Sequence, residues 1–314
     1  MVAVIGAATV AFAAFPTHAA NKQAAASATS ATAVAQRTFA TPEEGATALV
    51  NAVRAGSVNE ILEVIGVPSK TWLSSGDKVS DRAEWKTFLE AYDKKHSITM
   101  EGSKAVLNAG EGDWSFPAPL IKKGDRWMFD AEAGREEMLN RRVGRNELDT
   151  VQTLLAIVDA QREYAAQTAS GKGLIAYAAK FRSSPGKKDG LYWPTKAGEA
   201  PSPLGPLVAR AVLEGYGGAS KAGSQPAYHG YHYRLLTEQG KCAPGGAFSY
   251  MVNGKLFGGF AVVAWPASYG NSGVQTFMVN HDGVVYAKDL GPGSAAEAAK
   301  MKLFDPGPGW TRVP

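Results

Sequence analysis

The strongest constraint on the fold lies near the C-terminus, where three strand-like runs follow one another between turn signals. They are GYHYRLL (230–236), FGGFAVVAWPASYG (257–270) and FMVNHDGVVYAKDL (277–290). Asp282-Gly283 divides the last run, and this dipeptide favours a tight hairpin turn. Consecutive strands joined by short turns pair antiparallel. The sequence therefore predicts a C-terminal antiparallel sheet.

A long helix is predicted ahead of this sheet, over most of residues 134–181. A Gly-Lys-Gly sequence at 171–173 interrupts the pattern, so we expect a long helix followed by a shorter one from Leu174. The apolar residues of the long helix recur at helical spacing: Leu148, Val151, Leu155 and Val158.

The N-terminal part combines helical and strand-like patterns. Thr41 can cap a first helix, with Glu44 three residues later as a capping box requires. Two further helices are predicted at 59–65 and 81–95. Strands are then predicted at 97–107, 113–122 and 126–131. The predicted fold class is α+β: N-terminal helices plus an antiparallel meander, then the long helix and the C-terminal sheet.

Four regions follow from these patterns. We expect a signal peptide at 1–19, a flexible leader at 20–38, an N-terminal α+β domain at 39–133, and a long helix with its sheet domain at 134–314. The leader is rich in Ala, Ser and Thr, and such a composition buries too little apolar surface to offset the entropy of ordering.

The signal peptide is predicted from the uncharged apolar run at 1–15 and the small residues that follow it. We expect cleavage after Ala19, with Ala20 as the alternative. No Lys or Arg precedes the run, so we expect translation to start upstream of Met1. The other interpretation of the run is a buried N-terminal helix. An exported protein, periplasmic or secreted, is the prediction.

The composition of the chain limits the kinds of partner that it is expected to bind. With 33 basic and 29 acidic residues, the formal net charge is +4, and no basic stripe with interleaved aromatic residues appears. No nucleic-acid partner is therefore predicted. No later segment reaches the ~18 apolar residues of a membrane span, so none is expected after signal cleavage. Cys242 is the single cysteine, which excludes an internal disulfide.

A Gly- and Pro-rich segment at 183–228 carries the first candidate binding residues, Tyr192 and Trp193. Exposed aromatic side chains on a long loop can bind a glycan, a peptide or a partner strand. The other interpretation is that both side chains pack back on the protein and anchor the loop. A short helix is predicted within this segment at 204–214.

Further candidate binding residues are His232, Arg234, His281 and Asp282. His229 and His232 have the spacing of a metal-binding pair, but alternate residues of a strand point to opposite faces. No metal site is therefore predicted. His232 and Arg234 share one strand face, whereas His281 and Asp282 lie at the hairpin turn, where Asp before Gly also serves turn geometry.

The long helix begins with a cluster of charged residues, for which two interpretations stay open. One is an anion-binding site, and the other is a solvated helix face with Glu137 and Arg141 paired at i, i+4. The cluster comprises Glu132, Arg135, Glu136, Glu137, Arg141 and Arg142.

The three runs of the C-terminal sheet, together with GDWSFPAPLIKKGDRWMFDAEAG (112–134) and GRNELDTVQTLLAIVDAQREYA (144–165), resemble the bacterial DUF2950 family. The resemblance covers about residues 39–313. It implies an exported protein of Gram-negative bacteria with no established activity, so no functional residues carry over. The second half is also distantly similar in layout to pilins, and the first domain to small folds of the nuclear-transport-factor-2 type.

No nucleophile elbow, P-loop, H-E-x-x-H or EF-hand motif occurs, and we predict no catalytic residue and no cofactor. The leading hypothesis is a non-enzymatic binding or structural protein of the cell envelope, with an envelope protein or polymer as its partner. The alternative is an envelope hydrolase that uses a His/Asp/Arg cluster of the C-terminal domain. A self-assembling, pilin-like subunit is a third hypothesis.

Overall fold

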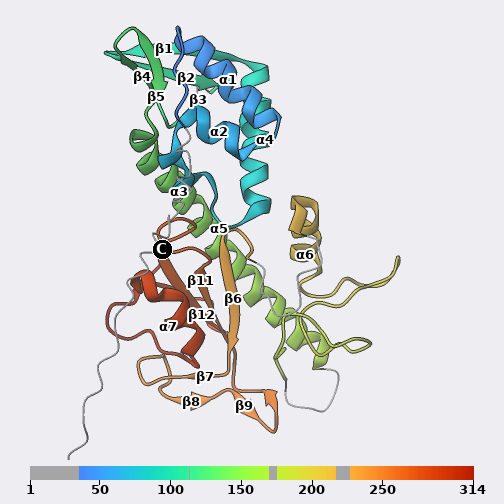
Figure 1. Cartoon of the computed structure of the whole chain (residues 1–314). Helices are drawn as coiled ribbons and strands as arrows, with labels where there is room; N and C mark the ends of the chain where they lie inside the picture. The colour runs from blue at the N-terminus through green and yellow to red at the C-terminus, as the bar shows by residue number, and fades with distance from the viewer. Residues whose placement is uncertain (1–34, 113, 170–174, 217–226) are drawn as a thin grey trace, which may run out of the picture. The chain divides into compact units, whose positions relative to one another are not determined.

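The computed structural model describes residues 35–112, 114–169, 175–216 and 227–314. Residues 34–314 form one compact unit by their contacts. Helices and antiparallel sheets occur in both halves of this unit (Figure 1), which confirms the α+β class. The predicted signal peptide and residues 20–34 of the predicted leader lie outside the described residues.

The N-terminal part packs helices on one sheet. Its helices are α1 (Pro42–Arg54), α2 (Val58–Ile65), the 3-10 turn η1 (Val67–Ser69), α3 (Lys70–Leu73) and α4 (Lys78–Lys94). The strands are β1 (His96–Glu101), β2 (Lys104–Ala109), β3 (Trp114–Ser115), β4 (Leu120–Lys123) and β5 (Arg126–Phe129). The sheet order is β1-β2-β4-β5, with β3 paired to β2.

Capping side chains set where these helices begin. The Thr41 hydroxyl accepts a hydrogen bond from the Glu44 amide at 3.2 Å, as predicted. Ser57 caps α2 in the same way. α4 begins at Lys78, earlier than predicted, because the carboxylate of Asp77 accepts hydrogen bonds from two amides of its first turn.

The prediction of one strand at 97–107 is wrong, because this segment forms β1 and β2 joined by a tight turn. Gly102 in that turn has a φ of +61°, which residues with a Cβ rarely adopt. The predicted strand at 113–122 is likewise divided into β3 and β4. Pro117 and Pro119 lie between these strands and lack the amide proton that a sheet ladder needs. Alternation of apolar residues continues through such short breaks, so periodicity alone did not mark them.

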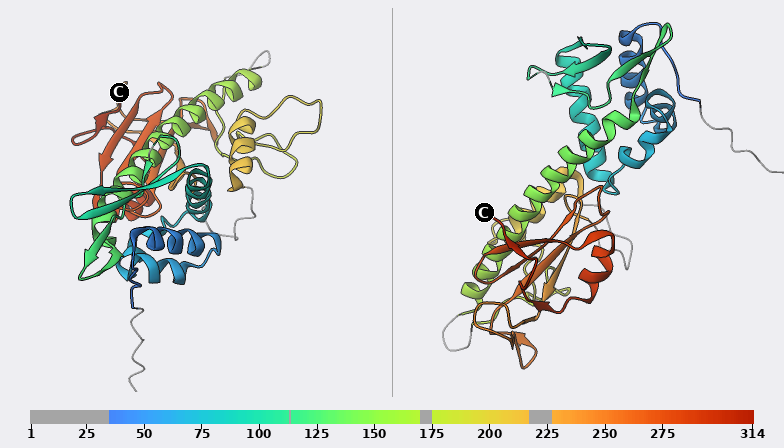
Figure 2. Two further views of the ribbon diagram at one scale, coloured as in Figure 1. Left: turned by 90° about the horizontal axis from the view of Figure 1, so that it is seen from above. Right: turned by 90° about the vertical axis from the view of Figure 1, so that its left-hand side faces the viewer.

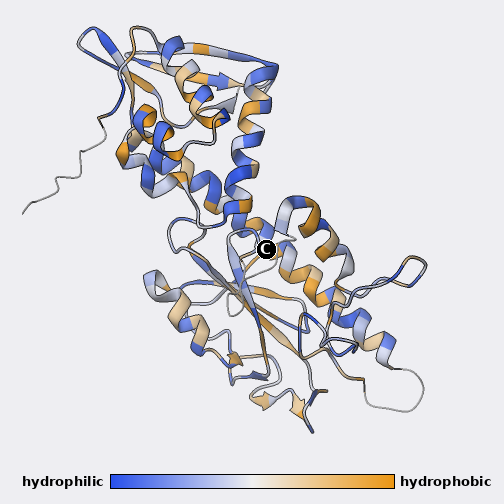
Figure 3. Ribbon diagram, turned by 45° about the vertical axis from the view of Figure 1, so that its right-hand side comes forward, coloured by the Kyte–Doolittle hydropathy of each residue, from blue (hydrophilic) through white to orange (hydrophobic). Residues whose placement is uncertain are grey.

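The long helix α5 (Ala131–Thr168) joins two hydrophobic cores and is 38 residues long. Its first turns supply Met138 and Leu139 to the N-terminal core, and its later turns supply Leu154 and Ile157 to the C-terminal core. Figure 3 shows the corresponding change, from a mainly hydrophilic first half to hydrophobic residues further along.

The prediction of a shorter helix from Leu174 is wrong for the described residues of this segment. Leu174 itself lies outside the described residues, and 175–181 contains no helix. Tyr177 instead forms a bridge with Leu256. The side chain of Gln161 bonds both the amide and the carbonyl of Ala178 at 2.8 Å, which holds this segment extended against α5.

The C-terminal part is built on a five-stranded sheet of order β15-β13-β12-β11-β6. Its strands are β6 (Tyr231–Leu236), β11 (Ala261–Pro266), β12 (Gln275–Asn280), β13 (Val285–Asp289) and β15 (Thr311–Arg312). Gly283, with a φ of +81°, closes the predicted hairpin between β12 and β13. α5 lies along one face, and α7 (Ser294–Lys300), where no element was predicted, lies on the other (Figure 2).

Smaller elements complete this part. The predicted helix at 204–214 is confirmed as α6 (Gly205–Ala211) followed by the π-helical segment η2 (Val212–Tyr216). The 3-10 turn η3 (Gly291–Gly293) precedes α7. The remaining strands are β7 (Glu238–Gln239), β8 (Phe248–Ser249), β9 (Met251–Val252), β10 (Lys255–Leu256) and β14 (Leu303–Phe304). The pilin-like layout stays a prediction.

Specific contacts begin within the predicted leader. The side-chain amide of Gln36 donates to the backbone carbonyls of Ile65 at 2.6 Å and Phe129 at 2.8 Å. The Arg37 amide donates to the Glu63 carbonyl at 2.7 Å. These bonds join the chain to α2 and β5, so the folded part starts before residue 39.

Gly134 in α5 allows a close approach to the segment before β4. A Cβ at Gly134 would lie 2.7 Å from the Cβ and 2.8 Å from the Cα of Ala118. We expect Gly134→Ala to lower the free energy of unfolding by about 1–3 kcal/mol, because neither backbone can yield easily. Urea unfolding followed by circular dichroism measures this.

Gly144 in the same helix is the matched control, since a Cβ added there would have no neighbouring atom within 4 Å. Gly144→Ala should raise the free energy of unfolding by up to about 1 kcal/mol, from helix propensity alone. Equal shifts of the same sign in both variants would show that the contact with Ala118 is unimportant.

Candidate functional site

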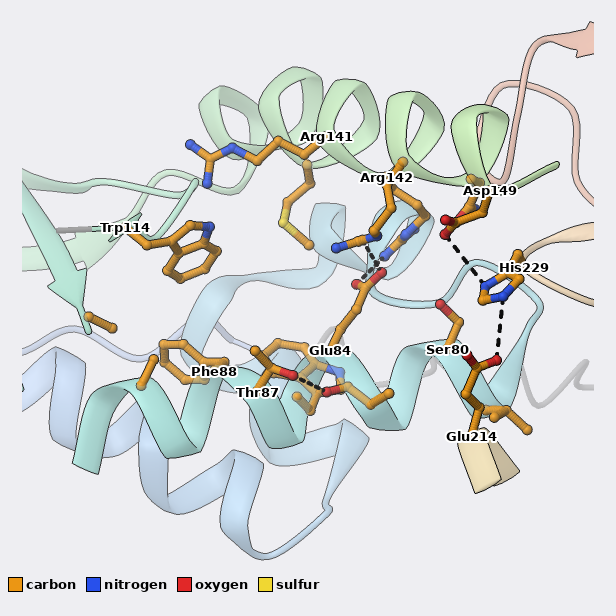
Figure 4. Close-up of a pocket in the computed structure, with 18 of the residues that line it drawn as sticks. Ser80, Glu84, Thr87, Phe88, Trp114, Arg141, Arg142, Asp149, Glu214 and His229 are labelled. Carbon is orange, nitrogen blue, oxygen red and sulfur yellow. Dashed lines mark hydrogen bonds and ion pairs between the residues drawn. The ribbon is translucent and has the colours of Figure 1, made fainter. Parts of the chain in front are cut away.

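A cavity of about 560 Å³ lies between α4 and α5 (Figure 4). One end of the cavity, called the aromatic end, is lined by Trp85, Phe88, Trp114, Phe116 and Met138. The opposite end, called the polar end, is lined by Ser80, Asn146, Asp149, Glu214, Tyr216 and His229. Glu84, Arg142 and Arg145 lie between the two ends and are called the central ion cluster.

Helical periodicity brings these residues to one place. Residues three or four apart lie on the same face of a helix. From α4 the cavity is lined by Ser80, Glu84, Thr87 and Ala91. From α5 it is lined by Met138, Arg142, Arg145 and Asp149. Each helix thus contributes one stripe along its length.

The aromatic end is a cluster of rings around Phe88. The Phe88 ring centroid lies 5.5 Å from that of Phe116 and 6.0 Å from that of Trp114. The guanidinium of Arg141 lies over the Trp114 ring at 5.4 Å. Trp114 is 39% exposed, so part of this aromatic surface is open to a ligand.

The central ion cluster crosses the cavity from α4 to α5. The Glu84 carboxylate lies 2.6 Å from Arg145 Nη2 and 3.6 Å from Arg142 Nη2. Arg142 is 2% exposed and donates to Asn271 Oδ1 at 2.7 Å and to the Trp72 carbonyl at 2.9 Å. Two guanidinium groups therefore share one carboxylate, and only Arg145 is well exposed.

At the polar end, an imidazole lies between two carboxylates. His229 Nδ1 is 3.6 Å from Asp149, and Nε2 is 3.4 Å from Glu214. Glu214 is also paired with Arg210 at 2.8 Å. His229 has a φ of +50°, a conformation uncommon for a residue with a side chain. The contacts of its ring explain why this conformation is retained.

Asp77 holds the segments around the polar end together. Besides capping α4, its carboxylate accepts hydrogen bonds from the Tyr216 hydroxyl at 2.8 Å and from the Gly230 amide at 3.2 Å. Burial, with the negative charge of Asp77, raises the pKa of Tyr216 far above its usual value. Tyr216 therefore acts as a neutral donor, and α4, η2 and the start of β6 meet at one buried carboxylate.

The structure places Tyr192 and Trp193 against the protein body. Trp193 is only 8% exposed, and Lys188 lies 5.3 Å from its ring. Arg182 lies 5.1 Å from the Tyr192 ring, and the Tyr192 amide donates to the Phe181 carbonyl. The pair is not an open aromatic surface, which corresponds to the second interpretation of this loop.

His232 and Arg234 lie on the face of the C-terminal sheet that α7 covers. The His232 ring packs 5.6 Å from Trp265. Arg234 donates hydrogen bonds to the carbonyls of Ala298 and Met301 at the end of α7. Burial lowers the pKa of Arg234, and its bonds fix α7 to β6.

His281 and Asp282 lie at the other end of the sheet. His281 Nε2 is 3.8 Å from Asp282, and the Asp282 carboxylate accepts from Asn280, within the hairpin turn. His232 pairs with the last part of β11 and Asn280 with its first residue, which separates them by about 13 Å along the strand. The structure does not bring the predicted His/Asp/Arg residues together.

The sequence analysis missed most residues of the cavity. Of its charged cluster, Arg141 pairs with Glu137 at 2.7 Å, as the solvated-face interpretation expects, whereas Arg142 is buried in the central ion cluster. One available signal was the i, i+4 stripe of polar residues on α5. Glu84, Glu214 and His229 come from distant segments, and no local pattern links them.

The sequence model of a family described as "Protein of unknown function (DUF2950)" matches residues 36–313. The chain belongs to the DUF2950 family. Neither a search of curated proteins nor a search of solved structures gave a match. The cavity of this DUF2950 protein is therefore interpreted from its own residues.

Within the described ranges, no group of three or more His, Cys, Asp and Glu residues is arranged to hold a metal ion. Nor does any helix in those ranges have the length and apolar composition needed to cross a bilayer.

Removal of the shared carboxylate tests the central ion cluster. We expect Glu84→Gln to lower the free energy of unfolding by about 2 kcal/mol, because the buried Arg142 loses its nearest negative charge. The control is Glu137→Gln, which breaks an exposed pair and should cost less than about 0.5 kcal/mol. Urea unfolding of both variants gives the comparison, and equal losses would contradict a structural role for the cluster.

Proposed function

We propose that this DUF2950 protein is a binding protein and that the cavity between α4 and α5 is its ligand site. The observation that carries the proposal is the pairing of an aromatic end with a polar end in one cavity of about 560 Å³. Small-molecule sites in proteins have this size and combine apolar walls with a few polar groups.

The arrangement of charges supports a built site. Glu84 is paired with Arg142 and Arg145, Glu214 is paired with Arg210, and buried hydrogen bonds of Arg142 and Asp77 hold the surrounding segments. Polar groups held in fixed positions bind a ligand without first having to be ordered. A binding role also fits the ring of His229, whose described contacts are to carboxylates and aromatic rings rather than to a nucleophile.

The alternative of an envelope hydrolase has less support. It requires His232, Arg234 and His281 to converge with a carboxylate, but His232 and Arg234 lie on β6 whereas His281 lies in the hairpin turn after β12. A partner protein or polymer bound at Tyr192 and Trp193 would first have to displace both rings from their packing. The cavity is therefore the better candidate for the binding function expected from the sequence.

We also propose that the protein acts in the periplasm or outside the cell, since residues 1–19 have the composition of a signal peptide. When the natural gene is expressed in a Gram-negative host, the product should be found in the periplasmic or secreted fraction with Ala20 as its first residue. Intact-mass measurement and N-terminal sequencing check this. A full-length product retained in the cytoplasm would contradict it.

An uncharged fluorescent probe tests the cavity. N-phenyl-1-naphthylamine should bind the wild type saturably with increased fluorescence. Ala83→Trp should weaken binding by about tenfold or more, because the indole would occupy the cavity. Lys86→Trp is the matched control, as Lys86 lies on the same helix with its side chain 78% exposed and outside the lining. Equal binding by both variants would place the probe elsewhere.

A further inference from the structure

The chemistry of the cavity also indicates what kind of molecule it takes. We infer that the ligand is a small zwitterion with an aromatic body, namely an aromatic α-amino acid. This inference rests on the proposed function and adds the ligand class to it.

The positive half of the recognition site is Arg145. Because Arg142 and Arg145 share the carboxylate of Glu84, the central ion cluster carries one uncompensated positive charge. Arg142 is buried, whereas Arg145 is 53% exposed and uses one of its nitrogens for Glu84. Since a guanidinium has five N–H donors, Arg145 has donors left for a ligand carboxylate.

The negative half is Asp149. Among the described residues, no Lys or Arg lies within ion-pair distance of its carboxylate; His229 lies 3.6 Å away, and the charge of Arg210 acts on it from further off. Glu214 differs, because Arg210 contacts it directly at 2.8 Å. Asp149 is 36% exposed and lines the cavity, so it is the carboxylate available to a ligand ammonium group.

The two charges are placed for one head group. Arg145 and Asp149 are four residues apart on α5, which puts their Cβ atoms about 6 Å apart on one face of the helix. An α-amino acid carries its ammonium and carboxylate groups on the same carbon, so it can contact both side chains at once. A ligand with a single charge would contact only one of the two.

The body of the ligand would extend toward the aromatic end. Phe88 and Trp114 lie on that side of the central ion cluster, and Asp149 lies on the opposite side (Figure 4). Aromatic rings at this spacing favour edge or offset contacts with another ring. A volume of about 560 Å³ has room for such a side chain.

Four forms of phenylalanine separate the charges from the body. They are the free amino acid, its N-acetyl form, its amide and the doubly capped form. Titration calorimetry of the full protein at pH 7 should give the free amino acid about tenfold tighter binding than either singly capped form. Phenylalanyl-phenylalanine, whose two charges lie on different residues, should bind more weakly than phenylalanine.

Two variants test which side chain binds the ammonium group of the ligand and which binds its carboxylate. In Asp149→Asn the free and N-acetyl forms should bind equally, because the ammonium group has lost its partner. In Arg145→Gln the free and amide forms should bind equally. Arg135→Gln, an exposed change on the same helix outside the lining, should keep both preferences. Circular dichroism and probe binding establish that each variant is folded.

A preference for free phenylalanine over both singly capped forms supports the inference. Equal binding of the N-acetyl and free forms, equal binding of the amide and free forms, or no binding of phenylalanine would overturn it. The proposed function is judged separately, by whether N-phenyl-1-naphthylamine binds and whether Ala83→Trp prevents it. Probe binding without zwitterion preference would keep the cavity as a binding site and reject this ligand class.

Discussion

The guanidinium of Arg142 connects segments that are far apart in the sequence. From α5 it donates to the Trp72 carbonyl of α3 and to Asn271, which lies between β11 and β12, and it faces Glu84 of α4. A buried charge is costly unless hydrogen bonds and an opposite charge compensate it. The folded state is therefore restricted to arrangements that bring these partners together, and this side chain is one of the contacts that fix the two cores to each other.

The cavity is a consequence of that arrangement. Where α4 and α5 face each other, an ion cluster joins them in place of interlocking apolar side chains. Apolar side chains that interlocked across this contact would leave less space. Asp77 adds a second buried carboxylate that draws η2 and the start of β6 to the same place. The polar end thus consists of residues from α4, α5, η2 and the segment before β6, and Asp77 binds the last two from outside the cavity lining.

Local sequence signals accounted for much of the fold. Thr41 capped its helix as expected, Asp282-Gly283 closed its hairpin, and the apolar spacing of 148–158 lay within α5. The errors occurred where a pattern continued through a break, as at Gly102, or where tertiary bonds replaced a local preference, as at Ala178. The fold does not bring the candidate binding residues together, since His232, Arg234, His281 and Asp282 are spread over the C-terminal sheet and Trp193 is buried.

The sequence by itself determined the family, the α+β class and the polar stripe on α5, because these depend on motifs and on contacts between residues close in the chain. Only the tertiary structure decided that Arg142 is buried, that Glu84 is shared, and that His229 lies between Asp149 and Glu214. The physical reason is that a side chain's charge environment depends on which distant segments pack beside it. The spacing of residues along the chain does not indicate which distant segments these are.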